Sequence, residues 1–295
     1  MTSPASFNIV IGNHEAMYRE SLHDLVTIIE SGLRSREHSV TYSIRDLKPA
    51  PHINLFVEYF GDDRCVDRLI RLKADDASLI FGVIGTEDVE DAYVMNGSRL
   101  AGLQRIAPHL DFVWTMTEQM DIYRRWCGHD RVALIELGSV GGAAFDAAQK
   151  DVDVLWYGRE GTLVHRWLSV LRARGVVVAS TGGSAPSYMR RDLLRRAKVV
   201  VDCRTHDTDR FLSPTRICAG LDAGAALVAE TFDSSALSSL YAYGIGGRDS
   251  ELADLVETIV AGGGWREIAA QSCQAFRAGR SMAALLETPL SVALM

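Results

Sequence analysis

Length, composition and charge set the first limits on this chain. Its 295 residues exceed a typical single domain, and 47% hydrophobic against 23% charged residues is the balance of a globular protein rather than a disordered or fibrous one. The net charge of −7 disfavours nucleic acid or an anionic membrane surface as the main partner.

The first half of the chain alternates short apolar runs with helical patterns. A buried strand is predicted at 7–12, and the spacing of apolar residues over 22–33 predicts a helix. A second helix is predicted at 66–72. Further strands are predicted at 40–44, 53–57, 79–84, 111–114 and 132–135. Strands that alternate with helices imply a mostly parallel sheet covered on both faces.

A second cycle of the same kind follows the small, flexible stretch 138–144. Its predicted strands are 153–157, 176–179, 198–201 and 226–229, and its predicted helices are 165–173 and 188–197, with final helical patterns at 252–259 and 268–286. We therefore predict an α/β protein of two Rossmann-like domains that face a central cleft, with residues 1–143 and 144–295 as the two domains.

In the predicted helix 188–197, Met189, Leu193 and Ala197 form the expected inner stripe. The arginine cluster lies opposite that stripe, and its members are Arg190, Arg191, Arg195 and Arg196. We interpret it as a solvated helix face, with an acidic partner surface as the alternative.

One segment of the second half is typical of a short helix followed directly by a strand. Ser213 is a good N-cap residue and Pro214 fits the first helical position. The first-turn amides and the helix dipole favour an anion, to which Arg216 would add a planar charged fork. The alternative is a capped helix that packs Ile217 and Leu221 inward and binds nothing.

Five cysteines are widely separated, and none belongs to a C-x-x-C pair. This pattern argues against a disulfide framework and against a zinc site. No apolar run is long enough to cross a bilayer, and the N-terminus lacks the basic and apolar regions of a secretory signal. We therefore expect a cytoplasmic protein with reduced thiols.

Several longer motifs carry a resemblance to known proteins. In the second half they are Asp153-Val-Leu-Trp-Tyr-Gly158, Gly175-Val-Val-Val178, Arg191-Asp-Leu-Leu-Arg-Arg-Ala-Lys-Val-Val-Val201, and Ser213-Pro-Thr-Arg-Ile217 with Leu227-Val-Ala-Glu230. In the first half they are Thr86-Glu87-Asp88, Asp111-Phe-Val-Trp-Thr-Met-Thr-Glu118 and Leu134-Ile-Glu-Leu-Gly138. With these motifs most of the chain resembles GT-B-fold glycosyltransferases, especially the bacterial group of spore-maturation glycosyltransferase-like proteins.

The resemblance implies transfer of a sugar from a nucleotide-sugar donor to an acceptor hydroxyl on a small molecule, polysaccharide or protein. It places the nucleotide in the C-terminal domain and the acceptor in the N-terminal one, with no metal or other cofactor. Ser213, Thr215 and Arg216 would meet the charge of the leaving diphosphate. Gly158 and Arg159 would face the same diphosphate; alternatively, Arg159 is a solvated loop charge and Gly158 only turns the chain.

The chain departs from the family at one motif. Many retaining members carry two glutamates, seven residues apart, on the nucleotide-sugar helix. The matching positions here, Ser213 or a neighbour and Ala219 or Gly220, hold no carboxylate. This leaves open an inverting transferase, a GT-B sugar-nucleotide epimerase or hydrolase, and a catalytically silent nucleotide-binding scaffold.

An inverting transferase needs a general base for the acceptor hydroxyl. Glu87 with Asp88 and His14 with Glu15 follow predicted strands, so both pairs would project from the carboxyl ends of strands, where such sheets bind ligands. Glu87 is the first choice because it also lies in the acceptor-side motif, and His14 is the second. The alternative role for each is a helix cap or a partner of the helix dipole.

Metal-dependent transferases usually carry an Asp-x-Asp pair, and two such strings occur. Asp151 and Asp153 precede a predicted strand, so we expect them to solvate its entrance. Asp207 and Asp209 follow a strand beside His206 and are the better metal candidates. The alternative, which we prefer, is that His206 contacts a phosphate or sugar of the donor and that no metal is bound.

Overall fold

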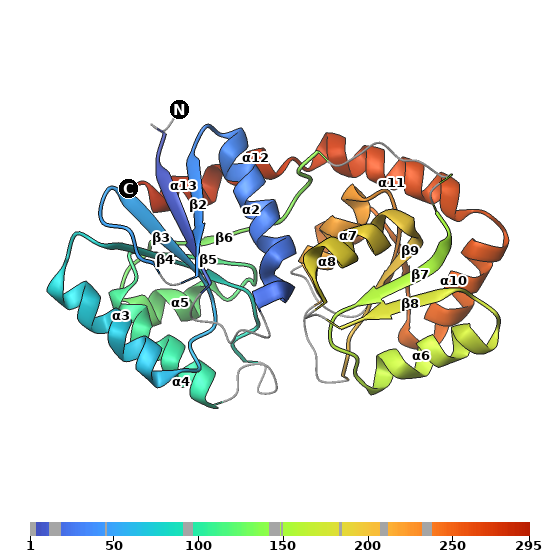
Figure 1. The fold of residues 1–295 in the computed structure, drawn as a ribbon, viewed down its shortest axis with the longest axis horizontal. Coiled ribbons are helices and arrows are strands. Elements are labelled where there is room, and N and C mark those ends of the chain that lie inside the picture. Colours follow the sequence, from blue (N-terminus) through green and yellow to red (C-terminus); the bar gives the residue numbers. More distant parts are fainter. Residues whose placement is uncertain are drawn as a thin grey trace. The chain divides into compact units, whose positions relative to one another are not determined.

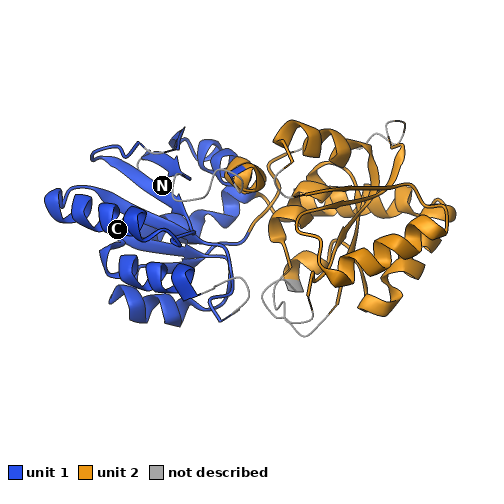
Figure 2. Ribbon diagram, turned by 60° about the horizontal axis from the view of Figure 1, so that its bottom comes forward, with its two compact units in different colours: residues 1–19, 29–136, 282–295 blue, residues 20–28, 137–281 orange. Residues whose placement is uncertain are grey.

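A computed structural model of the chain describes residues 4–11, 19–44, 46–90, 97–141, 148, 150–182, 185–206, 212–231 and 238–295. The chain folds into two compact units (Figure 2). Unit 1 comprises Met1–Arg19, Ile29–Glu136 and Met282–Met295, and unit 2 comprises Glu20–Ile28 and Leu137–Ser281. Relative to the predicted division at residue 143, unit 2 gains a short early segment and unit 1 gains the C-terminal segment.

Unit 1 is built on a sheet whose described strands run parallel in the order β2-β1-β3-β4-β5-β6. These strands are β1 (Ser6–Val10), β2 (Ser39–Ser43), β3 (His52–Val57), β4 (Ile80–Gly85), β5 (Phe112–Thr115) and β6 (Val132–Leu134). Each coincides with a predicted strand to within two residues at either end. The predicted parallel sheet of the first half is confirmed.

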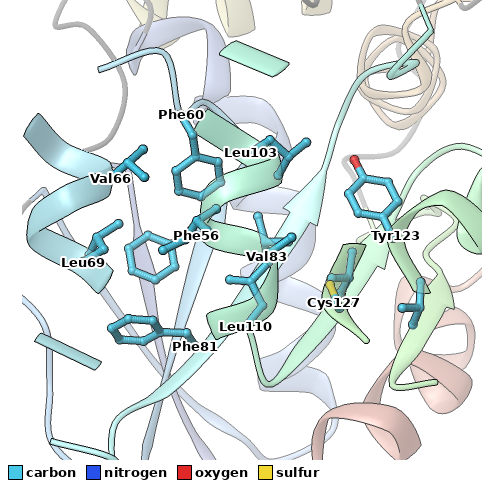
Figure 3. Packing of buried hydrophobic residues seen from close by; sticks show 14 of the residues in the cluster. Phe56, Phe60, Val66, Leu69, Phe81, Val83, Leu103, Leu110, Tyr123 and Cys127 are labelled. Atoms are coloured by element: carbon cyan, nitrogen blue, oxygen red, sulfur yellow. The ribbon is translucent and has the colours of Figure 1, made fainter. Parts of the chain in front are cut away.

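Helices cover both faces of this sheet (Figure 1). One face carries α3 (Asp63–Asp75), α4 (Gly97–Ile106) and α5 (Met120–Cys127). The other carries the second half of α2 (His23–Ser35) with α12 (Met282–Leu285) and α13 (Glu287–Ala293). In the first of these interfaces Phe56 and Phe81 meet edge to face, with ring centroids 5.4 Å apart, beneath Leu69 of α3 (Figure 3).

The C-terminal segment belongs to unit 1 because its backbone carbonyls accept hydrogen bonds from the sheet. The Trp114 indole donates to the Pro289 carbonyl (2.9 Å), and the Arg131 guanidinium donates to the Val292 and Ala293 carbonyls. The predicted single helical stretch 268–286 is wrong. It breaks at Arg280, which leaves helical geometry and donates from Nε to the Leu137 carbonyl.

Unit 2 contains a second parallel sheet, with the described strands in the order β11-β10-β9-β7-β8. These are β7 (Val152–Tyr157), β8 (Val178–Thr181), β9 (Ala197–Asp202), β10 (Ala226–Glu230) and β11 (Ile245–Gly247). The first four were predicted. β11 was not predicted, because its three residues are too few and too rich in glycine to show a strand pattern.

Helices also cover both faces of this second sheet (Figure 1). α6 (Thr162–Ala173) and α10 (Leu252–Ala261) share one apolar cluster with the sheet, and α7 (Ser187–Arg196) and α8 (Pro214–Asp222) pack on the other face. The remaining described elements of unit 2 are α9 (Ser238–Tyr241), α11 (Trp265–Gly279) and the 3₁₀ turns Glu20–Leu22 and Asp249–Glu251. A further 3₁₀ turn, Ala107–His109, belongs to unit 1. Across the described ranges, no helix combines the length and apolar character needed to traverse a bilayer.

Helix α7 presents a different face to the sheet from the one predicted. Met189 is 45% exposed, whereas Arg190 is 1% exposed and Leu194 is buried. The Arg190 guanidinium pairs with Asp24 at 3.1 Å and donates to the Glu20 carbonyl, both within unit 2. The interpretation of Arg190 as part of a solvated face is therefore wrong, because a buried carboxylate compensates its charge.

Candidate functional site

The strand order of unit 2 locates the place where a ligand is expected to bind. β8 lies on one side of β7, while β9 and β10 extend on the other, so the order reverses between β7 and β9. Open α/β sheets bind ligands at the carboxyl ends of strands on either side of such a reversal. The loop 158–161 leaves β7, and residues 203–206 are the described start of the loop that leaves β9.

Two glycines of the first loop have no room for a side chain. Gly158 has φ of +129°, and a Cβ there would lie 2.5 Å from Nη2 of Arg216. A Cβ on Gly161 would lie 2.0 Å from the Thr205 carbonyl oxygen. Glycine at 158 is thus required both by backbone conformation and by space.

The first turn of α8 shows the predicted cap. The Ser213 hydroxyl accepts a hydrogen bond from the Arg216 amide (3.3 Å), and the Ser213 amide donates to the Asp202 carboxylate (3.0 Å). Pro214 has no N–H to offer. Among the described residues, this leaves the Thr215 amide as the first-turn N–H with no partner, so the helix offers fewer donors than the sequence suggested.

Arg216 lies beneath this turn rather than on the surface. Its side chain is about nine-tenths buried, Nε donates to the Tyr157 carbonyl (2.8 Å), Nη1 pairs with Asp202, and the guanidinium stacks 4.1 Å from the Trp156 ring centroid. Burial raises the pKa of Asp202 to about 6, against the opposing effect of Arg216. The protein's own carboxylate therefore occupies the fork predicted for a phosphate, and contact of Arg216 with a donor stays a prediction.

The solvent side of the same edge carries further polar groups. Arg159 is exposed, with Nη2 3.5 Å from the Thr205 hydroxyl. The His206 ring lies against Gly161 and is half-buried. Arg204 holds the buried Glu230 carboxylate through Nε at 2.8 Å and through Nη2. The structure thus brings all six predicted binding residues to one edge of the unit 2 sheet.

Unit 1 has its own polar cluster after β3 and β4. Arg99 of α4 makes two hydrogen bonds to the buried Glu58 carboxylate, at 2.9 and 2.7 Å, and lies 3.8 Å from Glu87. Burial alone would lower the pKa of Arg99, but Glu58 and Glu87 outweigh it and raise that pKa. The Glu87 side chain is 34% exposed, whereas Asp88 accepts hydrogen bonds from Gln119 and the Glu90 amide. Of the two acids, Glu87 is the one beside a buried cation.

Other predicted residues fall elsewhere. His14, Asp207 and Asp209 lie outside the described residues. Asp151 accepts from Arg196 and Asp153 from Lys198, so these acids anchor side chains around the entrance of β7. Within the described ranges, no group of three His, Cys, Asp or Glu side chains could hold a metal ion.

Sequence reasoning missed Glu58, Arg99, Asp202 and Arg204. Glu58 directly follows β3, Asp202 ends β9, and Arg204 lies two residues after β9. Each strand lies beside a reversal of strand order, and that position is a usable signal once the order is known. Arg99 lies on a helix 41 residues from Glu58, and no local pattern connects the two.

Comparison with solved structures supports the fold, whereas comparison of sequences finds no match. No family model matches the sequence, and no curated protein sequence matches it. HepE from Anabaena, solved in complex with UDP-glucose, is 10% identical over 97% of this chain and 98% of its own, with a TM-score of 0.59. A TarM mutant from S. aureus, solved with Fondaparinux, alpha-GlcNAc-glycerol and UDP, is 11% identical over 84% of this chain, with a TM-score of 0.57. The trehalose-6-phosphate phosphatase N-terminal domain from Candida albicans is 10% identical over 99% of this chain and 97% of its own, with a TM-score of 0.55.

At such identities these comparisons show the fold alone. The predicted fold class, α/β with two Rossmann-like domains of the GT-B kind, is confirmed, and the structural neighbours include GT-B glycosyltransferases. This chain spans 56% of the length of the TarM chains. The narrower grouping with spore-maturation glycosyltransferase-like proteins stays a prediction.

Proposed function

We propose that the protein is a glycosyltransferase that moves a sugar from a nucleotide-sugar donor to an acceptor hydroxyl without a metal ion. The observation that carries this proposal is the edge of unit 2 at the reversal of strand order. A glycine turn, a helix N-terminus and the basic side chains Arg159 and His206 meet there. HepE, whose fold this chain shares, binds UDP-glucose in its own structure, which supports a nucleotide sugar as the ligand class.

Within this proposal three groups at this edge contact the donor diphosphate, and the buried pair below them holds the turn in place. Arg159, His206 and the Thr215 amide supply charge and hydrogen bonds to the phosphate oxygens. The pair of Arg216 and Asp202 fixes the ends of β7 and β9 below Gly158, so the turn above them keeps its conformation. Contact of Ser213 or Arg216 with the donor itself belongs to the same proposal.

In unit 1 we propose Glu87 as the general base that takes the proton from the acceptor hydroxyl. Arg99 lies 3.8 Å from the Glu87 carboxylate, whose side chain is 34% exposed and so accessible to an acceptor hydroxyl. Glu58 holds Arg99 in place. His14 remains the second candidate, and metal independence and a cytoplasmic location rest on the sequence.

The experiment is a thermal-shift and calorimetric screen of the full chain against nucleoside diphosphates and nucleotide sugars. A ligand that binds only the folded state raises its apparent stability. We expect one nucleoside diphosphate to bind selectively, and Arg159→Gln to weaken it by about tenfold, the loss of one charge-assisted hydrogen bond. Arg195→Gln is the matched control. Arg195 lies in the last turn of α7, before the start of β9, whereas the candidate site lies at the other end of that strand.

Turnover separates the alternatives. A transferase releases nucleotide only when an acceptor is present, an epimerase or hydrolase consumes the donor alone, and a scaffold binds without turnover. Glu87→Gln is expected to lower acceptor-dependent release by about 10²–10⁴-fold while donor affinity is kept. No stabilisation by any nucleotide, or equal binding by the Arg159 and Arg195 variants, would refute the donor site.

A further inference from the structure

Unit 1 contains a cavity that is lined by none of the residues assigned above to donor or acceptor. Its volume is about 250 Å³, and it lies between α3 and the neighbouring strands. It is lined by the apolar and thiol side chains of Val10, Ile44, Leu47, Phe56, Cys65, Leu69 and Leu72, and by the charged side chains of Asp62, Arg64 and Arg68. Phe56 and Leu69, which form part of its floor, appear in the close view of the unit 1 core (Figure 3).

The cavity has a cause in the chain connections. Parallel strands are usually joined by a crossover of a dozen or more residues that contains a helix. β2 and β3, which lie on opposite sides of β1, are joined by 44–51 alone, and the described part of that connection holds no helix. Among the described residues, no crossover helix covers the apolar ends of β1 and β3 beside α3, and Ile44 is 46% exposed.

Two positive charges and one negative charge line the cavity, so its lining carries a net positive charge. Arg64 and Arg68 lie one helical turn apart on α3 and are both exposed, and neither has an ion-pair partner among the described residues. The nearby acids are already engaged. The Asp62 carboxylate caps α3 by accepting from the Arg64 amide (3.0 Å), and Asp63 and Asp67 both pair with Arg105.

From this combination we infer that the cavity binds an anionic amphiphile, an alkyl chain that carries a phosphate group. The alkyl chain of the ligand occupies the apolar part of the cavity, which removes its surface from water. The guanidinium groups of Arg64 and Arg68 hold the phosphate. Two guanidinium groups one turn apart suit the charge of a phosphate better than that of a carboxylate. The lining residues all belong to unit 1, and the test measures binding rather than activity.

Cys65 offers a native reporter, because it lines the cavity and is half-buried while the other four cysteines are buried. The full chain is treated with N-ethylmaleimide, and modification of Cys65 is followed by peptide mass spectrometry. Decyl phosphate below its micellar concentration is expected to slow this modification by about tenfold at saturation. Inorganic phosphate at the same concentration is expected to leave the rate unchanged.

The double substitution Arg64→Gln with Arg68→Gln tests the phosphate contact. We expect it to weaken protection by decyl phosphate by about tenfold or more, since two charge-assisted contacts are lost. Arg71→Gln is the matched control: Arg71 is exposed on the same helix, outside the cavity, and donates to the Asp67 carbonyl. The Arg71→Gln protein should bind decyl phosphate as tightly as the unchanged protein does.

Three results would overturn the inference. They are no protection of Cys65 by decyl phosphate, equal protection by inorganic phosphate, and equal affinity in the double variant. In the first case, protection by anionic phosphatidylglycerol vesicles would mean adsorption to a membrane surface rather than binding of one amphiphile. The wild-type protection experiment stands without any variant, so a folding defect cannot obscure the answer.

Discussion

Gly158 shows how closely one residue of the candidate site is constrained. Its φ of +129° is a conformation that residues with a Cβ rarely adopt, and the space where a Cβ would lie is filled by the Arg216 guanidinium. The turn and the buried ion pair below it are therefore one structure. A side chain at 158 would disturb both.

Gly158→Ala and Gly175→Ala separate these two effects. Gly175 also has a positive φ of +81°, but its hypothetical Cβ has no neighbour within 4 Å in the part of the chain that the structure describes. We expect Gly175→Ala to lower the free energy of unfolding by about 1–2 kcal/mol from backbone strain, and Gly158→Ala to lower it by roughly 1–3 kcal/mol more from the clash. Urea denaturation measures both, and equal losses would contradict the close contact with Arg216.

His38 gives unit 1 a pH-dependent stability. Its Nδ1 accepts a hydrogen bond from the Ala5 amide (3.0 Å), and burial, together with Arg36, lowers the pKa of the ring. The folded state thus holds the neutral ring, while the unfolded chain takes up a proton more readily. The stabilising contribution is present above about pH 6.5 and is lost as the pH falls below it.

His38→Asn supplies a neutral acceptor in place of Nδ1. Urea denaturation at pH 7.5 and pH 5.0 should show that the unchanged chain loses more stability on acidification than the variant does. Parallel pH profiles for the two proteins would show that His38 does not titrate differently in the folded and unfolded states.

At the scale of elements, features set by neighbouring residues or by a periodic pattern were predictable. Features that depend on a charge partner far away in the sequence were not. The cap at Ser213 and the strand β10 that follows α8 were predictable because each depends on neighbouring residues. The inward face of α7 was not, because Arg190 is buried only through Asp24, 166 residues earlier. The sequence likewise predicted that the Arg216 guanidinium would bind a phosphate. It could not show that Asp202, at the end of a strand, pairs with this guanidinium.

Close packing of α4 on the loop after β3 gives a test at the same scale. A Cβ on Gly102 would lie 1.8 Å from the Phe60 carbonyl oxygen, a backbone atom that cannot rotate away. No atom of the described residues lies within 4 Å of a Cβ on Gly97. We expect Gly102→Ala to destabilise the protein by about 2–4 kcal/mol and Gly97→Ala to change stability by less than about 1 kcal/mol. Thermal and urea denaturation of the pair decide this, and a tolerated Gly102→Ala would show that α4 can move.

At the scale of the whole molecule, neither unit is a continuous stretch of sequence. Unit 1 is completed by Met282–Met295, and the Trp114 and Arg131 side chains both donate to carbonyls of that segment. The helical pattern of this segment was predictable. Its place in unit 1 was not, because it depends on contacts with residues more than 160 positions earlier.

Removal of Met282–Met295 is expected to loosen unit 1 selectively. Amide exchange in β5 and β6 should become faster by about tenfold or more, because α13 no longer covers these strands, while exchange in β7 and β9 should change little. Hydrogen exchange with mass spectrometry resolves these peptides. Equal acceleration in both sheets would instead indicate that the two units unfold together.

The same discontinuity affects how the chain folds during synthesis. The strands of unit 1 are made early, but the segment that covers β5 and β6 is translated only after all of Leu137–Ser281. At roughly 5–20 residues per second, a ribosome needs several seconds or longer for that stretch. The sheet of unit 1 therefore waits with part of its apolar face open while unit 2 acquires its full sequence. On the ribosome the later unit is expected to finish first, and the earlier one to need chaperone protection until its last helix arrives.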